Sequence, residues 1–314
     1  MSDIVTGQLI HTHPRDRVSE AVVAIPGSTV LNPCANCGGF AALVHVSVDD
    51  ERIVRCPGCG LVRQELRPAS PSDLYDQSYY MHDVPKGGYA NYVLDAGINR
   101  RTFHRRLRSF ERRVPDRGRL LDVGAALGDF VLEASALGWD AEGVEISSFA
   151  AEQARLRGAR VHTGSLEQLA LPSASYDVIT LYDAIEHLFD PAGTLTEISR
   201  LLRPGGVLHL VTPNVGGLQA RLLGRFWYHY KPGEHLYYFS PDTLRPLVER
   251  SDLLWDGWAP SGSYVTLSYV FNRLRHYSRQ PFAAFDSIGR KLRLGPAAFY
   301  LYVGEMEIWG SRPR

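Results

Sequence analysis

The sequence predicts a doubly wound α/β sheet preceded by a small amino-terminal zinc ribbon. Three observations predict this arrangement: apolar strands and helices alternate from Arg119 onward, the four cysteines form two closely spaced pairs, and 45% of the 314 residues are hydrophobic. Such an alternation is typical of parallel sheets with helices on both faces. The hydrophobic content is that of a globular protein, which excludes disorder as the main state.

The charge balance limits the classes of partner. Lys and Arg together number 34, and Asp and Glu together also number 34, so the formal net charge is zero. Proteins that bind nucleic-acid backbones usually carry a basic excess, so a nucleic-acid partner is not favoured. No stretch approaches the ~20 apolar residues of a membrane span, and residues 1–16 have no apolar segment behind a basic start. We therefore expect a cytoplasmic protein without a transmembrane segment.

The cysteine pairs have the spacing of a zinc site. They are Cys34 with Cys37 and Cys56 with Cys59, and eighteen residues separate the pairs. This spacing matches the template of a tetrahedral zinc site with four cysteine ligands. Alternating residues over 43–48 and 52–55 predict a hairpin between the pairs, with its turn at 49–51. Reduced structural cysteines and a disulfide pair are the alternatives.

A zinc ion with four thiolate ligands has no open position for a catalytic water, so we expect its role to be structural. The metal would fold a ribbon that is too small to build its own core. His45 lies on the predicted hairpin and is interpreted as a surface residue rather than a ligand.

Composition divides the chain into four parts. Residues 1–30 are polar or irregular and are expected to be mobile, residues 31–66 form the ribbon, residues 67–97 are a linker with an aromatic segment, and residues 98–314 form the main domain. Residues 264–302 are interpreted as an insertion before a final strand over 305–309. The inserted segment mixes aromatic and basic side chains. It is interpreted as a substrate lid, as a peripheral membrane surface for a lipid-linked acceptor, or as insertion helices without a special role.

A helix is predicted over residues 98–114, because Phe103, Leu107, Phe110 and Val114 recur on one face. Its other faces are expected to carry seven arginines: Arg100, Arg101, Arg105, Arg106, Arg108, Arg112 and Arg113. We interpret them as a solvated face, and binding of nucleic acid or another anion is the alternative.

The main domain is expected to contain parallel strands over 119–123, 141–144, 159–162, 178–181 and 207–211, with helices over 130–137, 149–157 and 194–202. Doubly wound sheets bind ligands outside the carboxyl ends of their strands. The loop after the first strand contains Gly124 and Gly128, but Ala126 and Asp129 stand where a dinucleotide-binding loop requires glycine. The sequence also lacks a phosphate-binding P-loop and a nucleophile elbow, which disfavours NTPases and serine hydrolases.

Five segments in order, 121–128, 143–147, 163–167, 176–191 and 202–214, resemble the motifs of class I S-adenosylmethionine-dependent methyltransferases. The cysteine pairs ahead of them are similar to those of sugar and natural-product methyltransferases. The run Ile185-Glu186-His187-Leu188 is similar to that of ubiquinone-pathway O-methyltransferases. The resemblance implies a Rossmann-like sheet of seven strands with the last one antiparallel.

The resemblance also implies a set of residues that bind S-adenosylmethionine: Asp122, Gly124, Ala125, Gly128, Glu145, Ile146, Ser165, Leu166 and Tyr182. Glu145 ends the second strand, where a carboxylate can accept hydrogen bonds from both ribose hydroxyls. Two positions depart from the family pattern, because Ser165 replaces a common aspartate and Ala126 replaces a common glycine.

Methyl transfer is an in-line displacement, so the protein mainly aligns the reactants and, for a hydroxyl acceptor, removes a proton. His187 follows the fourth strand and is the predicted base, and Asp183 is a lesser candidate. Glu186 is expected to orient a base or, as in the ubiquinone relatives, to contribute to a divalent-metal site. His235 is predicted to reach the acceptor. A buried structural histidine is the alternative for His187.

These features predict a methyltransferase that uses S-adenosylmethionine and a structural Zn²⁺. The expected acceptor is a small molecule, through a hydroxyl of a sugar or of a glycosylated or polyketide-like metabolite. One alternative is an RNA methyltransferase that reads nucleic acid with the ribbon and the arginine helix. Another is a scaffold that no longer turns over the cofactor.

Overall fold

The computed structural model describes residues 29–69, 96–267, 270 and 298–314. Its largest sheet has seven strands in the order β12-β13-β10-β9-β6-β7-β8. Their bounds are β6 Arg119–Val123, β7 Asp140–Glu145, β8 Val161–Thr163, β9 Tyr176–Tyr182, β10 Leu202–Pro213, β12 Leu254–Thr266 and β13 Ala298–Ser311. Strands β6 to β10 pair in parallel, and β13 is antiparallel to both β10 and β12. The predicted seven-stranded sheet is confirmed.

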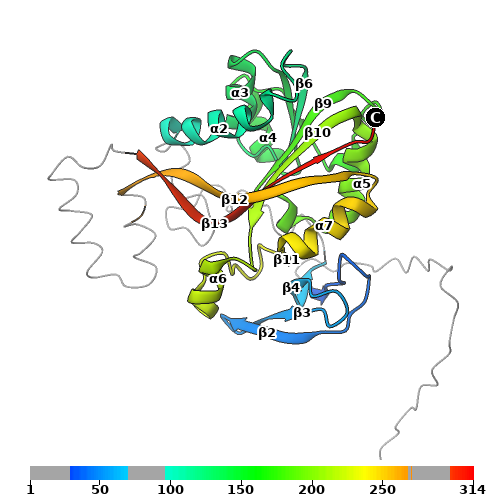
Figure 1. Cartoon of the computed structure of the whole chain (residues 1–314), viewed down its shortest axis with the longest axis vertical. Helices are drawn as coiled ribbons and strands as arrows, with labels where there is room; N and C mark the ends of the chain where they lie inside the picture. The colour runs from blue at the N-terminus through cyan, green and yellow to red at the C-terminus, as the bar shows by residue number, and fades with distance from the viewer. Residues whose placement is uncertain (1–28, 70–95, 268–269, 271–297) are drawn as a thin grey trace, which may run out of the picture.

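Helices cover both faces of this sheet (Figure 1). They are α2 Ala96–Glu111, α3 Asp129–Ala136, α4 Ser148–Leu156, α5 Pro191–Leu201 and α7 Pro241–Arg250. Successive strand residues point to opposite faces, so Leu120 packs in one core cluster with residues of α2, α3 and α4. Its neighbour Leu121 packs in the other cluster, with residues of α5 and α7.

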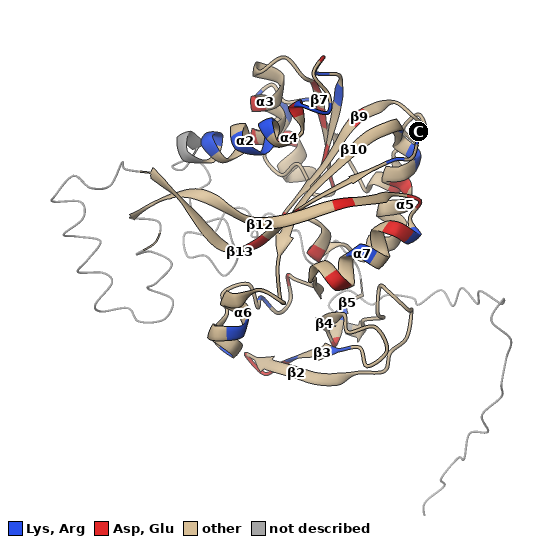
Figure 2. Cartoon of the chain, in the orientation of Figure 1, with Lys and Arg blue, Asp and Glu red and all other residues tan. Residues whose placement is uncertain are grey.

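The arginine helix is α2, and its apolar stripe is buried as expected, with Leu107 and Phe110 both fully covered. In Figure 2, positions coloured for Lys and Arg recur along the ribbon of α2. The interpretation of all its arginines as a solvated face is wrong at Arg106, which is 5% exposed. Position 106 lies three residues after Phe103 and four before Phe110, and therefore on the buried face of the helix.

The amino-terminal ribbon consists of β1 Thr29–Leu31, β2 Leu43–Val48, β3 Glu51–Arg55, β4 Val62–Gln64 and β5 Leu66–Pro68. Strands β2 and β3 form the predicted hairpin. Its turn contains Asp49 and Asp50, both with positive φ, as a tight two-residue hairpin turn requires.

A strand from the main domain completes the ribbon sheet. This strand is β11, Tyr237–Tyr238, and it pairs antiparallel with β4, so the order is β11-β4-β3-β2. In the same place Cys34, Cys56 and Leu61 share one core cluster with Leu236 and Phe239. The ribbon and the main domain therefore share a core, although the sequence suggested two separate parts.

Several expectations fall wholly or partly outside the described residues. These are the amino-terminal segment up to residue 28, the aromatic segment over 70–95, and most of the predicted insertion over 264–302. The two ends of that insertion are described, and they extend β12 and β13. In the described parts of the chain, no helix has both the length and the apolar character that crossing a membrane requires.

Candidate active site

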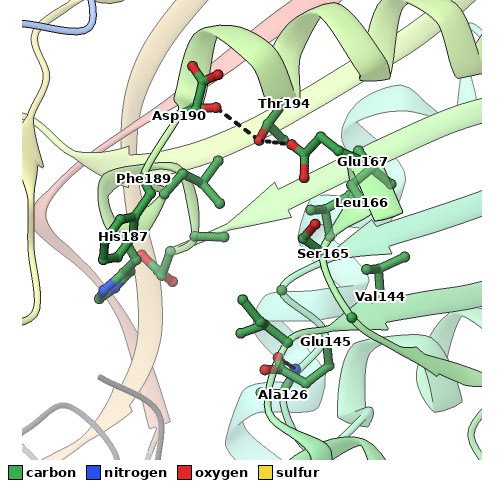
Figure 3. A pocket seen from close by; sticks show the side chains of 17 residues that line it. Ala126, Val144, Glu145, Ser165, Leu166, Glu167, His187, Phe189, Asp190 and Thr194 are labelled. Carbon is green, nitrogen blue, oxygen red and sulfur yellow. Dashed lines mark hydrogen bonds between the residues drawn. The ribbon is translucent and has the colours of Figure 1, made fainter. Parts of the chain in front are cut away.

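A cavity opens at the carboxyl ends of β6, β7, β8 and β9 (Figure 3). One side is formed by residues of the loops after the first three of these strands: Gly124, Ala126, Glu145, Ile146, Ser165 and Leu166. The other side follows β9 and includes Asp183, His187, Leu188, Phe189, Asp190 and Thr194. The cavity therefore lies where doubly wound sheets bind their ligands.

The carboxylate of Glu145 is fixed on one side of this cavity. Its Oε2 accepts a hydrogen bond from the Ala126 amide (2.9 Å), and its Oε1 accepts one from the Ser147 amide (2.8 Å). Ala126 has a positive φ of 46°, the conformation in which a glycine would be unstrained. An ionised carboxylate has about four acceptor positions, so Glu145 retains the capacity to accept hydrogen bonds from a ligand.

Gly124 starts the loop in the left-handed region, with φ 81°. A Cβ at this position would lie 2.9 Å from the Cβ of Ala184, so a side chain would clash with the far wall of the cavity. The glycine therefore allows the first loop to pass close to the turn that follows β9.

Four of the predicted cofactor residues are not among those that line the cavity, and these are Asp122, Ala125, Gly128 and Tyr182. Asp122 accepts a hydrogen bond from the Thr180 hydroxyl (2.5 Å), and burial raises its pKa to about 7. Gly128 abuts Ala154 and Ala159, and the Tyr182 hydroxyl bonds Nδ1 of His209 (2.8 Å). The contacts cited for Asp122, Gly128 and Tyr182 are all with other parts of the chain, so these residues suit support of the loops.

The sequence reasoning missed part of the lining, including Gly164, Glu167, Leu188, Phe189 and Thr194. The Thr194 hydroxyl, at the start of α5, donates to Oε1 of Glu167 (2.6 Å) and so joins the loops after β8 and β9. The available signal was position alone, because each residue follows the carboxyl end of a strand.

The three predicted catalytic residues converge. Glu186 and His187 lie in the short helix η3, Ile185–His187, and His235 lies just before β11. One ligand atom from each side chain lies within 4.8 Å of the others, and the two imidazole centroids are 4.7 Å apart. Of the three, only His187 lines the cavity.

The ring orientation of His187 is set by the chain. Its Nδ1–H donates to the Glu234 carbonyl oxygen at 2.9 Å, which leaves Nε2 as the acceptor nitrogen of the neutral ring. Burial, assisted by the charge of Lys231, lowers the pKa of His187 to about 4. The imidazole is therefore neutral at pH 7 and in the form that accepts a proton.

Glu186 and His235 form the buried surroundings of His187, with exposures of 1% and 3%. Oε2 of Glu186 accepts a hydrogen bond from the Thr212 hydroxyl (2.9 Å). Burial and the nearby Asp183 charge raise the pKa of Glu186 to about 8, and burial lowers that of His235. Oε1 of Glu186 and Nδ1 of His235 have no hydrogen-bond partner among the described residues. Two imidazoles and one carboxylate also make a donor set that suits a divalent transition metal.

An ion-pair cluster that the sequence did not reveal lies next to the cavity. The guanidinium of Arg106 is 3.9 Å from Asp183 and 3.7 Å from Glu305, and it stacks 4.6 Å above the ring of Tyr182. Burial and the charge of Asp183 raise the pKa of Glu305 to about 8. Because Asp183 lines the cavity, Arg106 links α2 to the wall of the site.

The four cysteines gather as predicted. The Sγ atoms of Cys34 and Cys59 are 3.3 Å apart, those of Cys37 and Cys56 are 3.6 Å apart, and one ligand atom from each of the four lies within 4.8 Å of the others. Tetrahedral zinc with Zn–S bonds of ~2.3 Å needs sulfur separations a little under ~4 Å. The donor set and its spacing therefore fit a structural zinc ion.

Comparison with known proteins gives consistent matches. The family model described as a methyltransferase domain matches residues 94–254. The ubiquinone biosynthesis O-methyltransferase of Xanthomonas oryzae pv. oryzae is 31% identical over 162 residues, which are 45% of this chain and 67% of that protein. A probable S-adenosylmethionine-dependent methyltransferase of Mycolicibacterium smegmatis is 45% identical over 62 residues, but the match spans 20% of this chain and only 24% of that relative.

Among solved structures, a methyltransferase of Thermotoga maritima described as a possible histamine N-methyltransferase aligns with a TM-score of 0.47 and 22% identity. The alignment covers 71% of this chain and 94% of that one. The family model spans about half of the present chain. The chain therefore belongs to the methyltransferase domain family, and one of the relatives it matches is named a probable S-adenosylmethionine-dependent methyltransferase.

Proposed function

We propose that this chain transfers a methyl group from S-adenosylmethionine to a hydroxyl of a small-molecule acceptor, such as a sugar or a glycosylated secondary metabolite. The observation that carries the proposal is a cavity that has the fixed carboxylate of Glu145 on one side and the neutral base His187 on the other. The similarity to ubiquinone biosynthesis O-methyltransferases supports an oxygen atom as the methyl acceptor.

Glu145, Ser165 and Leu166 would hold the nucleoside of the cofactor, since all three line the same side of the cavity. When bound, S-adenosylmethionine supplies an electrophilic methyl carbon on a positive sulfur. His187 would accept the proton of the acceptor hydroxyl on Nε2 as the oxygen–carbon bond forms and the carbon–sulfur bond breaks. The products are then the methyl ether, S-adenosylhomocysteine and a proton held by His187.

We also propose that Cys34, Cys37, Cys56 and Cys59 bind one structural Zn²⁺. This proposal is supported by the sulfur separations and by the closed shell that four thiolates provide. In this proposal the zinc ribbon is the predicted segment 31–66 together with the remaining residues of β1 and β5, and residues 98–314 are the methyltransferase domain.

Part of the basic surface of α2 that an RNA substrate would need is engaged within the chain. Arg101 and Arg105 stack on the rings of Tyr264 and Tyr300, and Arg106 is buried in its ion-pair cluster. These three cations are therefore engaged within the chain, and the exposed arginines of α2 without such a contact among the described residues include Arg100 and Arg108, so the free basic surface is smaller than the sequence suggested.

The test uses S-adenosylmethionine labelled in its methyl group, the zinc-loaded protein, and three acceptor classes: dihydroxyaromatic compounds, nucleotide-linked hexoses and total RNA. We expect the label on an oxygen of one of the first two classes, with release of S-adenosylhomocysteine. Calorimetry that detects no binding of S-adenosylmethionine or S-adenosylhomocysteine would overturn the proposal, as would label found only in RNA.

A further inference from the structure

We propose that the cysteine ribbon is a positioning element for the acceptor side of the site, and that it acts through Gln64 and Asn32. The inference rests on the proposed methyl transfer and adds a role for zinc in it. The ribbon would set the geometry around His187 and His235, whereas the cofactor side would form without it.

The ribbon holds the segment that carries His235. The carbonyl oxygen of Leu236 accepts two hydrogen bonds, one from the backbone amide of Gln64 (2.9 Å) and one from Nδ2 of the Asn32 side chain (3.0 Å). The Gly233 amide donates to Oε1 of Gln64 (2.9 Å). Gln64 and Asn32 are 4% and 1% exposed, so these bonds are shielded from water. The ribbon therefore fixes the chain on both sides of His235.

The same segment contacts the predicted catalytic turn from its opposite side. The Leu236 amide donates to the Glu186 carbonyl oxygen (2.8 Å), and the Glu234 carbonyl oxygen accepts from Nδ1 of His187 (2.9 Å). Leu236 therefore connects the two parts: its carbonyl oxygen bonds to the ribbon, and its amide bonds to the turn that contains Glu186. A shift of the ribbon would displace His235 and remove the partner that orients His187.

A second contact reaches the next residues of the cavity wall. Nη1 of Arg67, in β5, donates to the Phe189 carbonyl oxygen (2.8 Å), and its guanidinium stacks 4.7 Å from the Phe189 ring. Phe189 lines the cavity two residues after His187. The ribbon therefore holds the wall that contains His187 at two separate points.

Zinc occupancy would control these contacts because the positioning residues adjoin its ligands. Asn32 lies two residues before Cys34, and β4, which contains Gln64, starts three residues after Cys59. The buried Arg63 links the two halves of the ribbon, since its Nε donates to the Asn32 carbonyl oxygen (2.8 Å) and its Nη2 to that of Phe40 (3.1 Å). A unit this small depends on its metal to hold such contacts in register.

The cofactor side is built differently. The hydrogen bonds that fix the Glu145 carboxylate come from Ala126 and Ser147, which belong to the loops after β6 and β7. The Gly124 amide donates to the Val144 carbonyl oxygen (2.9 Å), also within the large sheet. We therefore expect cofactor affinity to be insensitive to the state of the ribbon.

The first experiment compares the full-length zinc-loaded protein, the protein after zinc removal by a chelator, and Gln64→Leu with zinc bound. Leucine keeps the size of the side chain but cannot accept the Gly233 hydrogen bond. Arg52→Ala is the control, because it breaks only the exposed ion pair of Arg52 with Glu65 on the same ribbon. The readouts are amide hydrogen exchange resolved by peptide and calorimetric affinity for S-adenosylhomocysteine.

In zinc-free protein and in Gln64→Leu we expect exchange over residues 185–189 and 233–238 to accelerate by about tenfold, the effect of losing roughly one buried hydrogen bond. Exchange over 120–130 and 143–147 and the affinity for S-adenosylhomocysteine should stay within ~2-fold of wild type. Arg52→Ala should match wild type in every readout. Unchanged exchange in Gln64→Leu would overturn the inference, as would acceleration over all peptides together with loss of affinity.

A kinetic measurement then uses the acceptor found by the labelled-methyl assay. We expect Gln64→Leu to lower kcat about tenfold while the KM for S-adenosylmethionine stays unchanged, since only the alignment of the acceptor side is altered. An unchanged kcat would contradict the positioning role. If the wild-type protein fails to bind S-adenosylhomocysteine, the proposed function is overturned instead. The exchange pattern still tests the ribbon contacts in that case.

Discussion

The imidazole rings of His187 and His235 lie 4.7 Å apart between centroids and meet edge to face, at 83°. His187 comes from the turn after β9 and His235 from the segment before β11. The elements between them in the chain are α5, β10, α6 (Leu218–Leu223) and the short helix η4 (Gly224–Phe226). Only His187 faces the cavity. The pair therefore combines one ring that can meet an acceptor with one that is enclosed behind it.

Replacing His187 by glutamine should lower the methyl-transfer rate by ~10²-fold or more and leave cofactor affinity nearly intact, because the base is removed while Glu145 is untouched. With a pKa of about 4, this group should produce no inflection in the wild-type rate between about pH 6 and pH 8. Rate profiles against pH and calorimetry with S-adenosylmethionine measure both effects.

The control for this variant is His104→Gln, at a partly exposed histidine that pairs with Glu133 away from the cavity. It should retain the wild-type rate. If His187→Gln also retains the wild-type rate, the base must be His235 or Asp183. Recovery of His187→Gln upon addition of a divalent transition metal would indicate a ligand role for the residue instead.

Glu145→Gln should weaken binding of S-adenosylmethionine by ~10-fold or more. The amide has one acceptor atom in place of two, so it cannot accept hydrogen bonds from both Ala126 and Ser147 and also serve a ligand. Glu152→Gln, an exposed position on α4, is the matched control and should bind normally. Equal affinities of the two variants in calorimetric titrations would remove Glu145 from the cofactor site.

Arg106→Met should lower the free energy of unfolding by about 1–3 kcal/mol, because Asp183 loses its cation and the protonated Glu305 loses a buried polar neighbour. Arg108→Met removes an exposed arginine from the same helix and should change stability by less than about 0.5 kcal/mol. Urea unfolding measures both values. A similar small loss in the two variants would show that the Arg106 cluster has little net effect on stability.

Glu305→Gln should change how stability depends on pH. In the folded chain burial raises the pKa of Glu305 from 4.5 to about 8, so the native state keeps a proton that the unfolded state releases above pH 4.5. The stabilising contribution of Glu305 is therefore fully present below that pH and is lost as the pH rises through about 8.

Glutamine cannot ionise and imitates the protonated carboxyl group. Between about pH 5 and pH 9 the variant should gain stability relative to wild type, on the order of 1–3 kcal/mol. Glu249→Gln, at an exposed position on α7, should show no such trend. Parallel stability curves for Glu305→Gln and wild type across this range would contradict the raised pKa.

The large sheet was predictable because its signals are local. Each buried strand is a short apolar run, and each helix between them has its own periodicity, so the order of elements follows from the sequence. The resemblance supplied the antiparallel last strand, and β13 confirms it. The strand ends were less well defined, since β10 begins at Leu202 and contains an irregular stretch before Val207 that shows no strand pattern in sequence.

The cavity was predictable in part. Gly124, Glu145, Ser165 and Leu166 follow strand ends in recognisable motifs, and they line the cavity. Arg106 was not recognised, because a charged residue on a helix is normally solvated, and its burial depends on Asp183 and Glu305 from distant strands. The contacts of Phe189 with Arg67 and of Thr194 with Glu167 could likewise not be predicted from the sequence.

The amino-acid sequence alone determined the sheet, the cysteine cluster and the residues at the strand ends. The signals for these features are residue spacings and hydrophobic periodicities between positions that are close together in the sequence. Only the tertiary structure decided that β11 joins the ribbon sheet, and that Leu236 lies between Gln64 and Glu186. The physical reason is that pairing of β4 with β11 depends on backbone hydrogen bonds between residues about 175 positions apart. Such bonds use groups that every residue carries, so they leave little trace in the sequence.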